Sequence, residues 1–119
     1  SAYIVANKNK LAQVFYNIFD NSFSYSPSKS KILINTILID ENIIFHIVDQ
    51  GIGIPLDFRE KIFDRFYTDR LKDKDKHTGL GLSISRKIID SFKGNINLIE
   101  NNYEIYQGAC FEIKLPLKG

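Results

Sequence analysis

The 119-residue chain has little cysteine, little net charge and no long apolar run. Its single cysteine, Cys110, allows neither an intrachain disulfide nor a zinc site built from cysteines, so a reducing cytosol is the expected environment. No apolar run approaches the roughly 20 residues that a membrane-spanning helix needs. The formal charge of +2 is too small for bulk attraction to nucleic acid or to an anionic membrane.

The remaining composition is that of a globular domain. Hydrophobic residues make up 44% and charged residues 25%, and neither a repeat nor a linker divides the chain. The hydrophobic periodicities predict one α/β two-layer sandwich, with a mixed β-sheet of about five strands covered on one face by three helices. The expected strands are 3–6, 31–39, 42–48, 95–100 and 108–116, and the expected helices are 10–23, 56–63 and 79–92.

The stretch 49–55 is the most informative part of the sequence. It follows an apolar, β-branched run that predicts a buried strand, so Asp49 places a carboxylate at a strand end. Gly51 and Gly53 let the backbone turn with positive φ or lie against a flat ligand, and Pro55 ends any ladder. The pattern alone is compatible with a ligand site and also with an ordinary turn.

The residues before Asp49 predict which way its side chain points. Ile43, Phe45, Ile47 and Asp49 share one face of the strand, and His46 lies on the other. If the first face meets the helices, Asp49 extends the buried face into a cavity between sheet and helix. His46 is then better interpreted as a sheet-surface residue than as a ligand.

The first helix carries two asparagines one turn apart. Its apolar stripe is Leu11, Val14, Phe15, Ile18 and Ser22, while Asn17 and Asn21 lie on a neighbouring face. Asparagine is a mediocre helix former, so the pair indicates either a solvated face or amides that point into a polar cavity. An amide oxygen in such a cavity suits a hard cation such as magnesium.

The third quarter of the chain contains a charged segment between an aromatic cluster and two glycines. Phe63 and Phe66 are expected to be packing anchors, and residues 68–78 to form a mobile, solvated loop. Gly79 and Gly81 open a helix, and free N–H groups at a helix N-terminus favour anions. The predicted apolar stripe of that helix is Leu80, Ile84, Ile88 and Phe92.

Together these motifs resemble the GHKL ATP-binding fold, specifically the catalytic ATP-binding domain of sensor histidine kinases. Residues 17–21 with 25–27 resemble the N box, 49–54 the first glycine motif, 63–67 the F box, and 79–82 the second glycine motif. The resemblance covers nearly the whole chain, and four motifs in this order and spacing are specific. It implies that residues 1–119 are one such domain, excised from a longer chain.

The resemblance also implies roles for individual residues, with ATP and Mg²⁺ as cofactors. Asn21 would coordinate magnesium, Asn17 would lie beside the phosphates, and Asp49 would accept a hydrogen bond from the adenine 6-amino group. Arg65 and Arg70 are candidates to supply positive charge near the phosphates. The implied nucleotide-binding set is Asn17, Asn21, Tyr25, Asp49, Gly51, Gly53, Ile54, Gly79, Leu80, Gly81 and Leu82.

The activity implied by the resemblance is transfer of the γ-phosphoryl group of ATP to a histidine on a separate helical-hairpin domain of the same kinase. Neither His46 nor His77 has the context of that phosphoacceptor. A response regulator would be an indirect partner, nucleic acid would not be one, and the isolated domain is expected to be monomeric. Its expected location is the cytoplasmic side of a membrane-bound sensor kinase.

Departures from the family pattern leave two alternatives open. Asn17 stands where the related ATP hydrolases have a glutamate that activates water, and an amide cannot act as that base. Phe23 and Ser24 replace a common basic residue, and Ala109 replaces a threonine. The alternatives are a catalytically degenerate ATP-binding regulatory module and a protein-serine kinase of the same fold.

Overall fold

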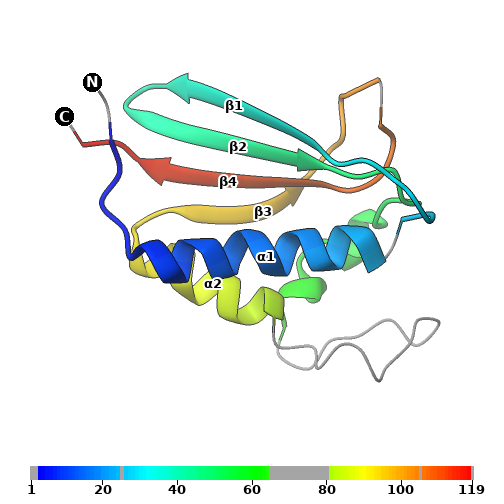
Figure 1. The fold of residues 1–119 in the computed structure, drawn as a ribbon, viewed down its shortest axis with the longest axis horizontal. Coiled ribbons are helices and arrows are strands. Elements are labelled where there is room, and N and C mark those ends of the chain that lie inside the picture. The colour runs from blue at the N-terminus through cyan, green and yellow to red at the C-terminus, as the bar shows by residue number, and fades with distance from the viewer. Residues whose placement is uncertain (1–2, 25, 65–80, 105, 119) are drawn as a thin grey trace.

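The structure is a computed structural model that describes residues 3–24, 26–64, 81–104 and 106–118. A sheet forms one layer, with strand order β1-β2-β4-β3, and the helices α1 and α2 lie side by side against one of its faces (Figure 1). The elements in chain order are α1 (Lys8–Ser24), β1 (Leu33–Ile39), β2 (Asn42–Val48), η1 (Leu56–Phe58), η2 (Lys61–Phe63), α2 (Gly81–Ser91), β3 (Asn95–Ile99) and β4 (Cys110–Pro116). The two-layer α/β sandwich is therefore confirmed.

The predicted mixed sheet of five strands is wrong. Among the described residues the sheet has four strands, and all three strand pairs are antiparallel. Asp40 and Glu41 both have positive φ in the two-residue turn between β1 and β2, and so short a turn joins only antiparallel strands. Residues 3–6 form only an isolated bridge between Tyr3 and Lys118. The chain then turns into α1, which Asn7 caps by accepting a hydrogen bond from the Lys10 N–H at 3.0 Å.

Two helices also differ from the prediction. The stretch 56–63 forms two short 3₁₀ helices rather than one helix. In α2, Ile84 is 37% exposed and does not belong to the buried stripe, which instead contains Leu82, Ser85, Ile88 and Ile89. The apolar spacing alone missed Ser85, whose small side chain lets α2 approach α1 closely. The predicted member Leu80 lies outside the described residues.

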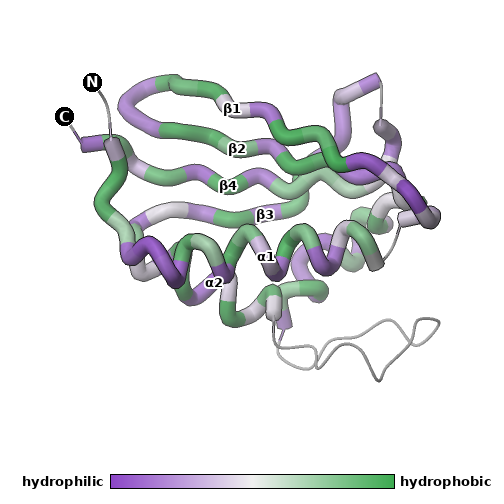
Figure 2. The backbone as a smooth tube through the Cα atoms, viewed as in Figure 1, coloured by the Kyte–Doolittle hydropathy of each residue, from purple (hydrophilic) through white to green (hydrophobic). Residues whose placement is uncertain are grey.

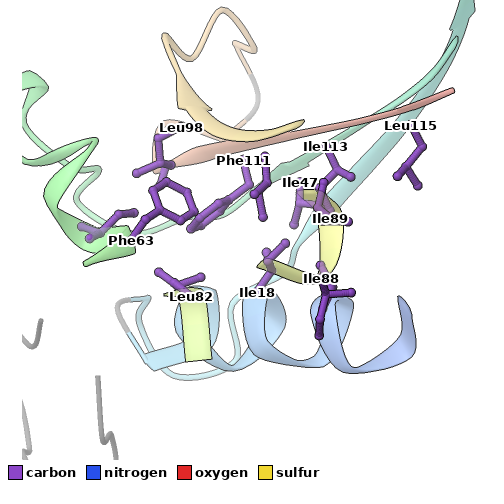
Figure 3. Packing of buried hydrophobic residues seen from close by; sticks show 14 residues of the cluster. Ile18, Ile47, Phe63, Leu82, Ile88, Ile89, Leu98, Phe111, Ile113 and Leu115 are labelled. Carbon is purple, nitrogen blue, oxygen red and sulfur yellow. The ribbon is translucent and has the colours of Figure 1, made fainter. Parts of the chain in front are cut away.

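The core fills the space between the sheet and the two helices. Apolar and polar residues alternate along β4 (Figure 2), because its Phe111, Ile113 and Leu115 side chains point into this layer. Val14 and Ile18 of α1 and Ile47 of β2 are fully buried, which confirms the predicted stripe and strand parity. Phe63 of η2 lies beside Leu98 and Phe111 (Figure 3) and is a packing anchor as predicted. Phe66 is outside the described residues.

The described helices are short for a membrane span. None of them combines the length and the apolar character that crossing a bilayer requires.

Candidate functional site

Asp49 lies at the end of β2, where two loops hold its carboxylate. The Gly51 and Ala109 N–H groups both donate to Oδ1, at 2.9 and 3.0 Å. The Asp49 backbone is bonded to the same segment, since its N–H donates to the Ala109 carbonyl and its carbonyl accepts from the Gly108 N–H. The side chain is 2% exposed. Within the described residues no hydrogen bond ends on Oδ2, so one carboxylate oxygen is positioned and the other remains available.

Gly108 makes this arrangement possible because it has no side chain. This function of Gly108 was not predicted from the sequence. A Cβ atom at Gly108 would stand 1.8 Å from Asp49 Oδ1 and 2.7 Å from the Gly51 nitrogen. No side chain fits into that space. The sequence shows only that a glycine precedes the last strand. Its importance depends on the pairing of Val48 with Cys110, which places Gly108 next to Asp49.

Burial raises the pKa of Asp49 above its ordinary value. The hydrogen bonds from the Gly51 and Ala109 backbone, and the nearby Ser22 hydroxyl, act in the opposite direction but are smaller effects. Ser22 Oγ is fully buried and yet lacks the geometry of a hydrogen bond to any described residue. Asp49 Oδ2 and the Ser22 hydroxyl thus lie in one buried polar region. A ligand that donates a hydrogen bond there would stabilise the ionised form of the Asp49 carboxylate.

Asn17 connects the two helices beside this region. Its Nδ2 donates to the Gly81 carbonyl and to Ser85 Oγ, both at 3.0 Å, and Ser85 Oγ donates to the same carbonyl at 2.8 Å. A Cβ at Gly81 would meet the Asn17 side chain at 3.5 Å, so the helices touch here. The structure therefore brings Asn17 and Gly81 together, as the motif order predicts, and gives the Asn17 amide nitrogen a structural function.

Asn21 is one turn further along α1 and is half-buried. In the described part of the chain its amide has no hydrogen-bonding partner, unlike that of Asn17. Its chain neighbour Ser22 lies beside Asp49. An amide oxygen in this position is available to a ligand or to a hard cation.

The remaining predicted residues divide into two groups. Gly53 has a φ of +80°, which glycine adopts without strain, and lies close to the carbonyl of Gln107. Ile54 packs against the core and Leu82 is buried in it. Tyr25, Arg65, Arg70, Gly79 and Leu80 lie outside the described residues, as do His77 and the predicted mobile loop 68–78.

A cavity of about 380 Å³ lies against the glycine loop and is also lined by Gly108 and Ala109. Gly53, Ile54, Leu98 and Asn101 are among the residues that line it, and Asp49 is not. We therefore define the candidate site by the Asp49 carboxylate and the neighbouring Ser22 hydroxyl, and not by this cavity.

His46 lies on the opposite face of the sheet, as predicted. Its Nδ1 is 2.7 Å from the Tyr103 hydroxyl and its Nε2 is 2.9 Å from Glu112 Oε2. Asn35 Nδ2 also donates to the Tyr103 hydroxyl, at 2.9 Å. The imidazole is thus part of a satisfied surface network. Within the described ranges, no group of three or more His, Cys, Asp or Glu side chains could hold a metal ion.

The chain matches a known family over almost its whole length. Residues 6–119 match the family model described as histidine kinase-, DNA gyrase B- and HSP90-like ATPase. The chain belongs to this family. Among the members of this ATPase family it is similar to histidine kinase P4 of Formosa agariphila, with 34% identity over 116 residues, which are 93% of this chain. That stretch is only 8% of the relative, so the chain spans a small part of its length.

Solved structures agree with this assignment to the ATPase family. A mycobacterial sensor histidine kinase, MprB, superimposes with a TM-score of 0.83 at 25% identity, covering 97% of this chain and 75% of that one. Full-length ShkA in complex with AMPPNP superimposes with a TM-score of 0.76 at 26% identity, covering 96% of this chain and 23% of that one. The fold and the motif order are therefore those of the catalytic ATP-binding domain of sensor histidine kinases.

Proposed function

We propose that this domain binds Mg-ATP and donates the γ-phosphoryl group to a histidine on a separate phosphoacceptor domain of the same kinase. The observation that carries the proposal is the Asp49 carboxylate, buried at the end of β2 with one oxygen held by two backbone N–H groups. The phosphoacceptor helical hairpin, the response regulator beyond it and the cytoplasmic location in a membrane-bound sensor kinase are parts of the same proposal.

Adenine would be recognised by the free side of this carboxylate. An ionised carboxylate is purely a hydrogen-bond acceptor, so Oδ2 suits the exocyclic amine of adenine and opposes guanine, which presents a carbonyl there. Gly51 and Gly53 allow a close approach of the base, and contacts of Ile54 and Leu82 with the base rest on the motif order alone. The raised pKa fits this assignment, because a ligand amine supplies the stabilisation of the charge that burial has removed.

Magnesium fits the donor set on α1. The half-buried Asn21 amide offers an oxygen without a described partner, and amide oxygens are suitable ligands for this hard cation. Magnesium held there by Asn21 would supply positive charge that stabilises the triphosphate. Asn17 holds the first turn of α2 against α1, so the N–H groups of that turn are positioned for the phosphates.

Transfer to an imidazole would depend mainly on positioning, so no residue of this chain needs to be a general base. Asn17 also argues against ATP hydrolysis, since its amide cannot activate water. The proposed nucleotide contacts of Tyr25, Gly79 and Leu80, and those of Arg65 and Arg70 near the phosphates, rest on the motif order alone.

The test is phosphorylation of a supplied histidine hairpin. The domain is incubated with a phosphoacceptor hairpin from a histidine kinase, magnesium and radiolabelled ATP, and the label on the hairpin is then treated with acid. We expect a label that acid removes, as for phosphohistidine. An acid-stable label would indicate the protein-serine kinase, and ATP binding without any label would indicate the regulatory module.

A further inference from the structure

Arg86 of α2 joins its own helix to η2 and to β3. Its guanidinium carbon lies 3.9 Å from the centre of the Phe63 ring in η2. Nη2 donates to the Ile96 carbonyl and to Asn97 Oδ1 of β3, both at 3.0 Å, and Nη1 pairs with Glu60. One planar side chain thus contacts a 3₁₀ helix, an edge strand and the residue just before η2.

These contacts differ in strength. The Glu60 side chain is 78% exposed, so its ion pair with Arg86 contributes little in water. The Arg86 side chain is only 25% exposed, and its stack on Phe63 and its bonds to β3 are better shielded. A flat guanidinium can make the stack and the two hydrogen bonds together, whereas an ammonium group cannot.

Phe63 connects Arg86 to the hydrophobic core. Its ring is 5% exposed and packs edge-on against Phe111, with centroids 6.3 Å apart and planes at 87°. Phe111 is fully buried in β4 and pairs with Ile47, two residues before Asp49. Arg86 therefore holds η2 against the layer of the sheet that ends at the candidate site.

On the other side of α2, the residue next to Arg86 faces α1. Ser85 is fully buried and bonds with Asn17 and with the Gly81 carbonyl. The first turns of α2 are thus held by α1 through Asn17 and Ser85, and by η2 and β3 through Arg86. A helix held on both sides cannot rotate or tilt without breaking one of the two sets of contacts.

We propose that Arg86 is a positioning residue of the nucleotide site, which sets the direction of the first turn of α2 by holding η2 and β3 against that helix. The inference rests on the proposed function, because that function places the phosphates at this turn. Arg86 acts through the orientation of α2 and does not touch the nucleotide. Its loss therefore weakens binding of the phosphates more than binding of the base.

Two ligands with the same base, of which only one carries a γ-phosphate and magnesium, test this difference. The 119-residue chain and its variants are titrated calorimetrically with ADP without magnesium and with AMPPNP plus magnesium. We expect Arg86→Gln to weaken AMPPNP binding by about tenfold, as for a network residue that couples to a site, and to change ADP binding by less than about threefold. Lys87→Gln is the matched control, since Lys87 is the exposed neighbour on the same helix, and both affinities should stay unchanged.

Arg86→Lys keeps the positive charge and provides a second variant in case Arg86→Gln does not fold. It should lower the AMPPNP affinity as Arg86→Gln does, because the planar fork is lost. Circular dichroism sets a temperature at which all variants are folded. Equal losses for both ligands, no loss for either, or an Arg86→Lys variant with wild-type AMPPNP affinity would overturn the inference. A wild-type chain that binds neither ligand would instead refute the proposed function itself.

Discussion

Gly108 lies so close to the Asp49 carboxylate that position 108 has no room for a side chain. A Cβ on Gly108 would lie 1.8 Å from Asp49 Oδ1, well inside the distance that two non-bonded atoms tolerate. The Gly108 N–H also donates to the Asp49 carbonyl at 2.9 Å. The position of the carboxylate therefore depends on a glycine 59 residues away in the chain, at the start of the segment that leads into β4.

Gly108→Ala should displace the Asp49 carboxylate and weaken ADP binding by more than about tenfold, because the backbone atoms around Gly108 leave no room for relaxation. Calorimetric titration measures the loss. Gly94→Ala is the matched control, since its Cβ would also clash, at 2.3 Å from the Lys114 carbonyl, but near the other end of β4. That control should lower stability and leave the affinity of the folded protein unchanged. Equal affinities for the two variants would show that Gly108 does not position Asp49.

Asn17→Ala should lower the free energy of unfolding by about 1–3 kcal/mol, because it removes two partly buried hydrogen bonds between the helices. Urea denaturation followed by circular dichroism gives the value. Gln13→Ala, one turn earlier at an exposed position of α1, should change it by less than about 0.5 kcal/mol. If both variants unfolded at the same urea concentration, the contact with Gly81 would not contribute to stability.

Asn21→Ala should reduce the affinity for ATP in magnesium and leave magnesium-free ADP binding largely intact, because the variant loses the proposed metal ligand, which would lie away from the base. Paired titrations with and without magnesium provide the comparison, and wild-type protein in the same buffers is the control. An equal loss under both conditions would mean that the Asn21 side chain is structural.

The raised pKa of Asp49 predicts a pH effect on stability. A carboxyl group with a higher pKa in the folded state than in the unfolded state stabilises the fold below the unfolded pKa, and this stabilisation is lost as pH rises through the folded pKa. From about pH 4 upward, the wild type should therefore lose stability relative to Asp49→Asn, whose amide does not titrate. Urea denaturation of both proteins across this range tests the sign. A difference independent of pH would mean that burial does not raise this pKa.

The sequence predicted those parts of the fold that depend on local patterns. The apolar stripe of Val14 and Ile18 located α1, and the alternation of Phe45, Ile47 and Asp49 placed the carboxylate on the helix side of the sheet. These patterns succeed because a helix or a strand buries one regular face. Local patterns were therefore enough to place α1 and the strand that ends at Asp49.

What the sequence did not predict depends on contacts between distant segments. Gly108 matters only because β4 pairs with β2, and Arg86 only because η2 and β3 meet at α2. The buried stripe of α2 was misplaced at Ile84, since a small residue, Ser85, packs against Asn17. The two-residue turn at Asp40 and Glu41 requires β1 and β2 to be antiparallel, but no local pattern reports the direction of β3 and β4, and the sheet was wrongly expected to be mixed.

Titration of the wild type and of Asp49→Asn with ADP shows whether this carboxylate binds adenine. The wild type should bind ADP and the variant should bind more weakly by about 1–3 kcal/mol, because a charged acceptor is replaced by an amide whose NH₂ group can face the adenine amine. Circular dichroism of the variant confirms that it is folded at the temperature of the titration. An ADP affinity unchanged by Asp49→Asn would contradict the assignment of this carboxylate to adenine, and with it the proposed nucleotide site.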